Sequence, residues 1–194
     1  EHKKYPARPI LGSENSTRYD AWQAVIGNPY VSGQFLWIGI DYLGEAAGWP
    51  VRSWTRGLFD LCGFKKPDGW FRQSIWSDTP MVYLCVRPQG QDRRQGPQSH
   101  WNWPAQSSVA VFAYSNCQDV TLELNGKPLE SRQPAQTPWR MARWEVPFEP
   151  GTLTAVGKKD GKEVCRYTLT TAGPAEKIKL IPDCSTLKAN GRDV

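Results

Sequence analysis

The chain has 194 residues, enough for one or two modest domains but too few for a complete eight-fold β/α barrel together with anything else. Its composition of 39% hydrophobic, 22% charged and 12% aromatic residues excludes a disordered or fibrous chain and predicts a globular fold. The net charge is +5, but the 24 Lys and Arg residues are scattered among 19 Asp and Glu residues. A nucleic-acid surface needs a basic stripe, so we expect no nucleic-acid partner.

Two further classes are excluded by what the sequence lacks. No apolar run approaches the roughly 20 residues that cross a bilayer, so we expect no membrane span. The sequence contains two His and five Cys residues, and no C-x-x-C pair. Because no ligand cluster has the spacing of a metal site, we expect no metal and no other cofactor. The cysteines can form one or two disulfides, or they can serve as small buried apolar side chains.

The first eighty residues alternate apolar strings with helical patterns. Residues 9–12 predict a buried strand and residues 19–26 a helix, and the continuous apolar run 35–40 predicts a strand covered on both faces. A second helix is indicated around residues 70–75. This order is typical of a parallel β/α sheet, but two strands cannot form such a sheet alone. The segment therefore either packs on something else or is the end of a larger domain.

From residue 81 onward, the pattern changes to the period-two alternation of an all-β domain. Asn125-Gly126 and Asp160-Gly161 each predict a tight hairpin turn. About seven short strands in this region are the number expected of an immunoglobulin-like sandwich. We expect three units: residues 1–79, the sandwich at 80–172, and a linker at 173–194 that includes the first strand, 177–181, of a further, truncated domain.

Three carboxylates are candidates for chemistry. Glu14 directly follows an apolar strand, and catalytic side chains of barrel enzymes lie at the carboxyl ends of strands. The alternative is a surface glutamate that caps a turn. Asp41 and Glu45 lie four residues apart after the second apolar run. They suit an acid/base pair, or else they are solvated loop residues or partners of Arg52 and Arg56.

Aromatic residues surround these carboxylates. Trp37, Trp49, Trp54, Trp70 and Trp76 could stack on the apolar faces of sugar rings, which would suit a carbohydrate cleft, or they could pack in a core. The loop 100–104, with sequence His-Trp-Asn-Trp-Pro, either contacts a ligand or anchors the sandwich to its neighbour.

Several of these segments resemble one family. Residues 10–14 (ILGSE), 32–45 (SGQFLWIGIDYLGE) and 57–65 (GLFDLCGFK) are similar to the last quarter of the catalytic barrel in glycoside hydrolase family 2, in its β-galactosidase-like branch. Segments 100–103, 122–127, 144–147, 150–153 and 171–174 resemble the immunoglobulin-like domain that follows this barrel in many bacterial members. The resemblance covers nearly the whole chain, with the motifs in the right order. The fold class it implies is mixed: the last two strands and helices of a (β/α)8 barrel, followed by an all-β sandwich.

The resemblance also implies roles for individual residues. Residues 9–12 would be the seventh barrel strand and 35–40 the eighth, so that Glu14 matches the catalytic nucleophile. Trp37 matches an aromatic residue of the sugar pocket. The remaining substrate-side candidates are Asp41 and Glu45, which match residues with a structural or pocket-shaping role, and Trp54 and Arg56, on a loop that borders the substrate.

The implied reaction is retaining hydrolysis of β-galactosides or related β-glycosides, with no cofactor. A second carboxyl about 5 Å from the nucleophile would act as acid and base. In the family this residue lies in an Asn-Glu motif, and no Asn-Glu dipeptide occurs here. We therefore expect the chain to be inactive alone and to need the missing N-terminal part of the enzyme. The resemblance implies a periplasmic or extracellular location. The alternative function is a non-catalytic sandwich that binds carbohydrate or scaffolds a neighbour.

Overall fold

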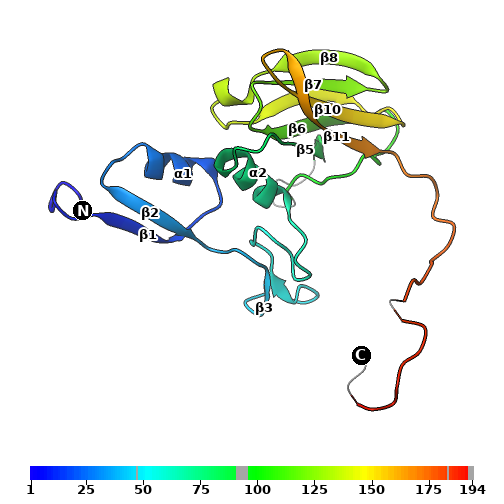
Figure 1. Ribbon diagram of the computed structural model, residues 1–194, viewed down its shortest axis with the longest axis horizontal. Coiled ribbons are helices and arrows are strands. Elements are labelled where there is room, and N and C mark those ends of the chain that lie inside the picture. The colour runs from blue at the N-terminus through cyan, green and yellow to red at the C-terminus, as the bar shows by residue number, and fades with distance from the viewer. Residues whose placement is uncertain (47, 91–95, 183, 192–194) are drawn as a thin grey trace.

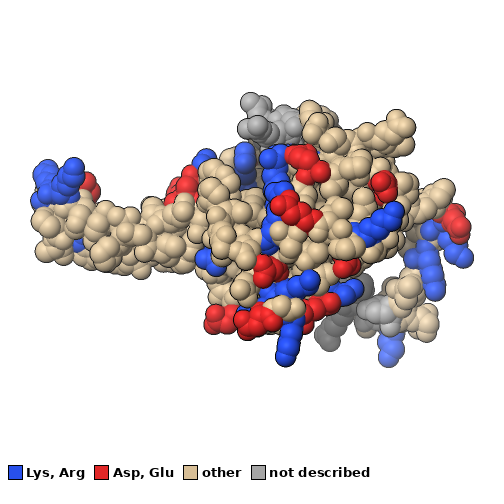
Figure 2. Space-filling view, turned by 90° about the horizontal axis from the view of Figure 1, so that it is seen from above, with Lys and Arg blue, Asp and Glu red and all other residues tan. Residues whose placement is uncertain are grey.

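The computed structural model describes residues 1–46, 48–90, 96–182 and 184–191, which form an N-terminal β/α part, a β-sandwich and an extended C-terminal segment (Figure 1). No helix in these residues is long and apolar enough to cross a membrane. On the face seen in Figure 2, Lys and Arg side chains are interspersed with Asp and Glu side chains.

The N-terminal part begins with a parallel strand pair. β1 (Ile10–Asn15) pairs with β2 (Val31–Leu36), and the helix α1 (Tyr19–Ile26) connects them. The helix has the bounds that the sequence predicts. The second strand does not, because the expected strand at 35–40 lies earlier, at 31–36. After Trp37, whose amide still donates to the carbonyl of Asn15, the chain leaves β1, and the carbonyls of Ile38 and Gly39 accept hydrogen bonds from a later loop instead.

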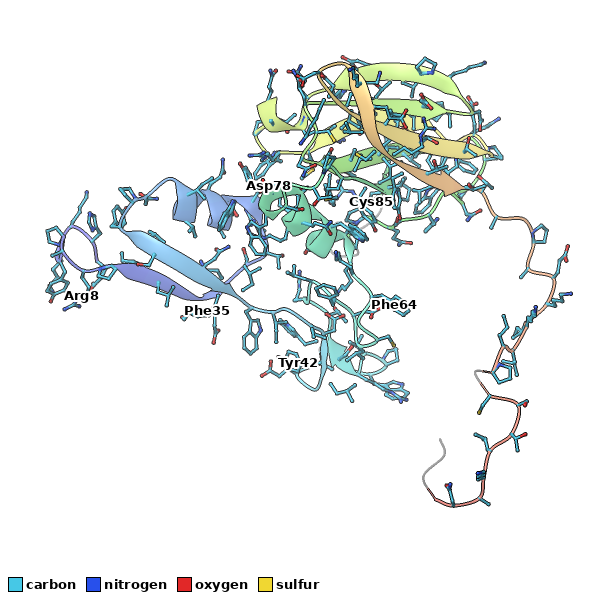
Figure 3. The ribbon with its side chains drawn as sticks, viewed as in Figure 1. Arg8, Phe35, Tyr42, Phe64, Asp78 and Cys85 are labelled. Atoms are coloured by element: carbon cyan, nitrogen blue, oxygen red, sulfur yellow. The ribbon has the colours of Figure 1, made fainter. Side chains whose placement is uncertain are left out.

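The prediction that this strand is buried on both faces is also wrong for the described residues. Phe35 is 63% exposed and Leu11 on the neighbouring strand is 56% exposed. Figure 3 places Phe35 well away from the sandwich. An apolar run predicts burial, but burial needs a partner layer, and the described residues supply none over these side chains.

A short antiparallel pair and a second helix lead to the sandwich. β3 (Tyr42–Leu43) pairs with β4 (Ser53–Trp54), and α2 (Pro67–Trp76) begins with a proline in its first turn. The apolar side of α2 packs on the sandwich: Trp70 stacks on Tyr83 at 4.9 Å between ring centroids, and Phe71 meets Tyr114 at 5.3 Å. The helix thus joins the N-terminal part to the β-domain (Figure 1).

Within the described residues, the β-domain is a sandwich of seven strands in two antiparallel sheets, as the sequence predicts. One sheet has the order β5-β6-β9 and the other has the order β11-β10-β7-β8. The bounds are β5 (Val82–Pro88), β6 (Ser108–Ser115), β7 (Asp119–Leu124), β8 (Lys127–Arg132), β9 (Ala142–Pro147), β10 (Thr152–Lys159) and β11 (Lys162–Thr170), with a 3-10 turn η2 (Pro134–Gln136) before β9.

Both predicted hairpin turns are confirmed. Asn125 and Gly126 have φ values of 50° and 77°, and Asp160 and Gly161 have 50° and 74°. Two successive positive φ angles match the right-handed twist of the flanking strands, which explains the choice of Asn-Gly and Asp-Gly at these turns.

The core lies between the two sheets and includes Trp101 from the loop 100–104. Trp101 is fully buried in it, donates from Nε1 to the carbonyl of Glu149 at 2.9 Å, and meets Phe148 edge-on. Trp101 fits neither interpretation of this loop, because its indole is enclosed in the core of the sandwich itself and faces neither a ligand nor a neighbouring unit.

The C-terminal segment differs from expectation. Residues 177–181 form no strand, and Ile178 is 92% exposed. A strand forms only where its backbone N–H and C=O groups pair with a neighbouring strand, and no described strand lies beside this segment. The unit boundaries at 79/80 and 172/173 stay predictions.

Candidate functional site

The carboxyl ends of β1 and β2 meet at one edge of the parallel pair. Glu14 is the penultimate residue of β1 and is exposed. Trp37 follows the last residue of β2, and its amide donates to the carbonyl of Asn15 at 3.0 Å. This hydrogen bond holds the last residue of β1 beside the residue that follows β2, so that the Glu14 carboxylate and the Trp37 indole come from the same edge.

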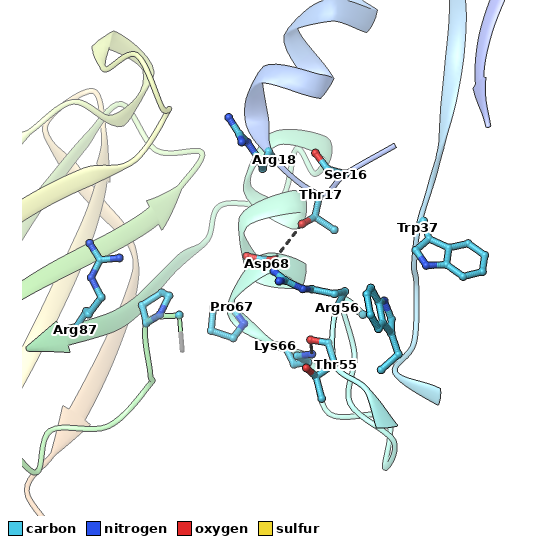
Figure 4. A pocket seen from close by; sticks show the side chains of 14 residues that line it. Ser16, Thr17, Arg18, Trp37, Thr55, Arg56, Lys66, Pro67, Asp68 and Arg87 are labelled. Atoms are coloured by element: carbon cyan, nitrogen blue, oxygen red, sulfur yellow. Dashed lines mark hydrogen bonds between the residues drawn. The ribbon is translucent and has the colours of Figure 1, made fainter. Parts of the chain in front are cut away.

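A hollow of about 570 Å³ lies beside this edge, between the loops after β1 and β4, the start of α2 and the sandwich (Figure 4). Trp37, Trp54 and Arg56, three of the residues expected on the substrate side, line it; their contact with a substrate stays a prediction. Ser16 and Thr17, just after β1, line it as well. Glu14 itself is not among the lining residues.

The hollow has a mixed but mainly positive lining. Arg18, Arg56, Lys66 and Arg87 contribute cations, and Asp68 contributes a carboxylate that accepts a hydrogen bond from Thr17 Oγ1 at 3.0 Å. Arg18 is paired with Asp20. The sequence interpretation singled out Arg56 but missed Lys66 and Asp68, which reach the hollow from the start of α2: Lys66 directly precedes the helix and Asp68 lies in its first turn.

Asp41 does not line the hollow; it organises the loop behind it. The carboxylate is buried, accepts from Lys66 Nζ at 2.9 Å on both oxygens, and accepts from the amide of Gly57 at 2.7 Å. Lys66 also donates to the carbonyl of Thr55. The cation beside Asp41 is thus Lys66, 25 residues away, and not one of the arginines considered from the sequence.

Glu45 is likewise outside the hollow. Its carboxylate accepts a hydrogen bond from the phenol of Tyr42. This hydrogen bond, with smaller contributions from desolvation and from the charge of Glu45, raises the pKa of Tyr42 to about 12. Tyr42 in turn meets the ring of Trp37 edge-on at 6.1 Å. Glu45 therefore touches the aromatic edge of the site through Tyr42.

The five candidate tryptophans divide between the two interpretations. Trp37 and Trp54 line the hollow, whereas Trp70 packs against Tyr83. Trp76 meets Trp22 edge-on, and Trp49 is largely exposed, with Arg52 over its ring. The indole nitrogen of Trp54 is buried and has no hydrogen-bond partner among the described residues.

Arg72 is a further residue near the site that sequence reasoning missed. Although charged, it is 1% exposed, and it donates to three consecutive backbone carbonyls at 3.0 to 3.2 Å: those of Ser16, Thr17 and Arg18. Burial lowers the pKa of Arg72, with Asp68 acting in the opposite direction. The helix α2 thereby fixes the segment that directly follows β1. The sequence did offer one signal for this role: Arg72 is a charged residue between Phe71 and Ser74, on the inward side of the predicted helix.

Known proteins similar to this chain can now be compared with this geometry. A family described as "Domain of unknown function (DUF4982)" matches residues 106–165, which include most of the sandwich. The "Beta-galactosidase BoGH2A" of Bacteroides ovatus is 35% identical over 182 residues, which are 92% of this chain and 20% of that protein. The chain thus spans about one fifth of the length of this relative.

Solved structures agree with the sequence matches. A glycosyl hydrolase family 2 member from Bacteroides cellulosilyticus superposes with a TM-score of 0.80 at 32% identity, covering 99% of this chain and 28% of that chain. A β-glycosidase from Bacteroides vulgatus superposes with a TM-score of 0.70 at 31% identity, covering 88% of this chain and 20% of that one. These comparisons confirm the resemblance that the motifs indicate: over most of its length, this chain belongs with glycoside hydrolase family 2.

Proposed function

We propose that this chain is the nucleophile-bearing part of a longer retaining glycosidase that hydrolyses β-galactosides or related β-glycosides. In this proposal residues 1–79 complete a (β/α)8 barrel, and Glu14 is the nucleophile. The observation that carries the proposal is the meeting of Glu14 and Trp37 at the carboxyl edge of two parallel strands joined by a helix. Active sites of barrel enzymes are built at this edge.

The uncovered surface of the N-terminal part supports a larger sheet. Leu11 on β1 and Phe35 on β2 are more than half exposed, as is Ile26 on the helix between them. Large exposed apolar side chains and open strand edges on a two-stranded parallel sheet favour aggregation unless another layer or strand covers them. Additional barrel strands from the same longer protein would cover these side chains and pair with the open strand edges.

The proposed chemistry has two steps. The ionised carboxylate of Glu14 attacks the anomeric carbon, and the bond to the leaving oxygen breaks as a second carboxyl gives that oxygen its proton. The same carboxyl, now ionised, then takes a proton from water, which attacks the anomeric carbon and releases Glu14. This chain carries the first group, and the rest of the longer protein supplies the second, about 5 Å away.

The remaining candidates would hold the sugar or shape its pocket. The ring of Trp37 is 41% exposed and offers a face for stacking on the apolar side of a sugar. Trp54 has a buried indole N–H without an acceptor among the described residues, which a sugar hydroxyl could satisfy, and Arg56 adds donors nearby. Asp41 and Glu45 act on the pocket indirectly, since each holds a neighbouring side chain.

The experiment uses the longer protein that contains this chain. Glu14→Gln removes the nucleophile with little change in volume, so kcat on aryl β-galactosides and aryl β-glucuronides should fall by at least about a thousandfold. Glu163→Gln, on the exposed face of β11, is the matched control and should keep normal turnover. The Glu14→Gly variant, which leaves more space, should regain turnover when azide is added. Azide then attacks the anomeric carbon in place of the Glu14 carboxylate, and the product is an α-glycosyl azide. Near-normal activity of Glu14→Gln would reject the assignment.

A further inference from the structure

Two thiols face each other inside the sandwich. Cys117, in the turn between β6 and β7, and Cys165, on β11, are 48 residues apart in sequence, and their Sγ atoms lie 3.5 Å apart. Both are reduced in this structure. Cys117 is buried, and Cys165 is partly buried on the inward side of β11. The pair therefore spans from the last strand of one sheet to the connection that joins the two sheets.

A glycine makes room for both sulfur atoms. Gly157 on β10 lies directly opposite Cys165 in the ladder. A Cβ atom at this position would lie 2.7 Å from the Sγ atoms of Cys117 and Cys165 alike. Real Cβ contacts are longer than this, so any larger residue would push the sulfurs from their places. The absence of a side chain at 157 keeps a gap in the sheet that the two sulfurs fill.

We propose that Cys117 and Cys165 are a redox-active pair that forms a disulfide across the sandwich. A disulfide has an S–S distance of about 2.05 Å, so bond formation requires the sulfurs to approach by roughly 1.5 Å. Changes in side-chain torsion alone supply movements of this size. The bond would tie β11, an edge strand, to the β6–β7 turn, and it would close a loop that contains β7, β8, β9 and β10.

The oxidant is a second disulfide, either a small molecule such as oxidised glutathione or a disulfide-bonded oxidoreductase. Cys165, the more accessible thiol, loses its proton to solvent, and its thiolate attacks one sulfur of the oxidant to form a mixed disulfide, while the S–S bond of the oxidant breaks and its other sulfur leaves as a thiolate that takes up a proton. Cys117 then loses its proton and attacks Cys165 Sγ, releasing the second thiol of the oxidant. Two electrons pass to the oxidant, which ends as two thiols.

Burial controls the rate of this exchange. Desolvation, with a smaller contribution from Cys117, raises the pKa of Cys165 to about 12. The thiolate fraction at neutral pH is correspondingly small and rises about tenfold for each pH unit below the pKa. The disulfide should thus form slowly at neutral pH and faster in alkali. Closing a loop of this length should raise the melting temperature of the sandwich on the order of 10 °C.

The test is disulfide mapping of the longer protein after treatment with oxidised glutathione at mildly alkaline pH. Non-reducing digestion and mass spectrometry should find the peptides of Cys117 and Cys165 linked, with two hydrogens fewer than the reduced pair, and dithiothreitol should separate them. Cys117→Ser removes the resolving thiol and should leave glutathione on Cys165. Gly157→Ala should lower the yield of the linked peptides relative to the unsubstituted protein.

Three outcomes would overturn the proposal. In the first, both cysteines remain alkylatable after long oxidation of the folded protein. In the second, either cysteine is linked to a different cysteine. In the third, the linked and reduced proteins melt at the same temperature, which would show that the bond does not constrain the sandwich.

Discussion

Replacing Arg72 by methionine (Arg72→Met) should release the segment that follows Glu14 while keeping an apolar stem in the helix. The guanidinium makes three hydrogen bonds to the carbonyls of residues 16–18. A hydrogen bond from a charged donor contributes about 1.5 kcal/mol, and part of this returns when the freed carbonyls meet water. The net loss should be about 3 kcal/mol, which is more than a hundredfold in the local opening equilibrium.

Hydrogen exchange measures this loss directly. The amides of residues 16–20 should exchange more than a hundredfold faster in Arg72→Met, and those of the sandwich core should change far less, because the broken contacts are local. Arg166→Met is the control, since Arg166 pairs with Glu163 on the exposed surface of β11. In the longer enzyme, displacement of Glu14 by about 1 Å should lower kcat roughly hundredfold. Unchanged exchange at residues 16–20 would refute the role assigned to Arg72.

Three further predictions rest on other contacts. Gly57→Ala should destabilise the protein by more than about 2 kcal/mol in thermal unfolding, because the added Cβ would lie 2.4 Å from the backbone nitrogen of Asp41. Gly39→Ala is the control and should be tolerated, because a Cβ at position 39 would meet no described atom within 4 Å beyond its chain neighbours. In ultraviolet difference titration, the Tyr42 phenol should ionise near pH 12, and in Glu45→Gln it should ionise nearer its ordinary pKa of 10. Because the pKa of Tyr42 is raised, its hydrogen bond to Glu45 is fully present below pH 10 and is lost as the pH rises through 12. Residues 1–194 alone should bind a hydrophobic dye, and Phe35→Ser should reduce the binding; equal dye fluorescence in both would contradict the uncovered face.

Local signals in the sequence explain which elements could be predicted. The α1 helix and both hairpins follow from residues close together in the chain: apolar spacing for the helix, and Asn-Gly or Asp-Gly for the turns. The bounds of β2 could not be found this way. The apolar run at 35–40 reflects a need for burial, but pairing with β1 is set by backbone hydrogen bonds, and these favour residues 31–36.

The site depends on contacts between distant residues, which a single sequence does not display. Arg72 holds carbonyls 54 to 56 residues away, and Asp41 is paired with Lys66 rather than with an arginine of its own loop. Trp37 is expected within a strand at 35–40 and lies instead directly after β2, so its place beside the hollow is indicated by the resemblance to the family alone. Resemblance to the family supplied the role of Glu14, which neither spacing nor composition could give.

Covalent labelling tests the central claim most directly. An activated 2-deoxy-2-fluoro β-glycoside should inactivate the longer enzyme by forming a glycosyl ester that hydrolyses slowly. The fluorine slows both formation and hydrolysis of the ester, whereas the good leaving group speeds only its formation. Peptide mass spectrometry should then find the sugar on Glu14. A sugar ester on any other carboxylate, in this chain or elsewhere in the enzyme, would contradict the account.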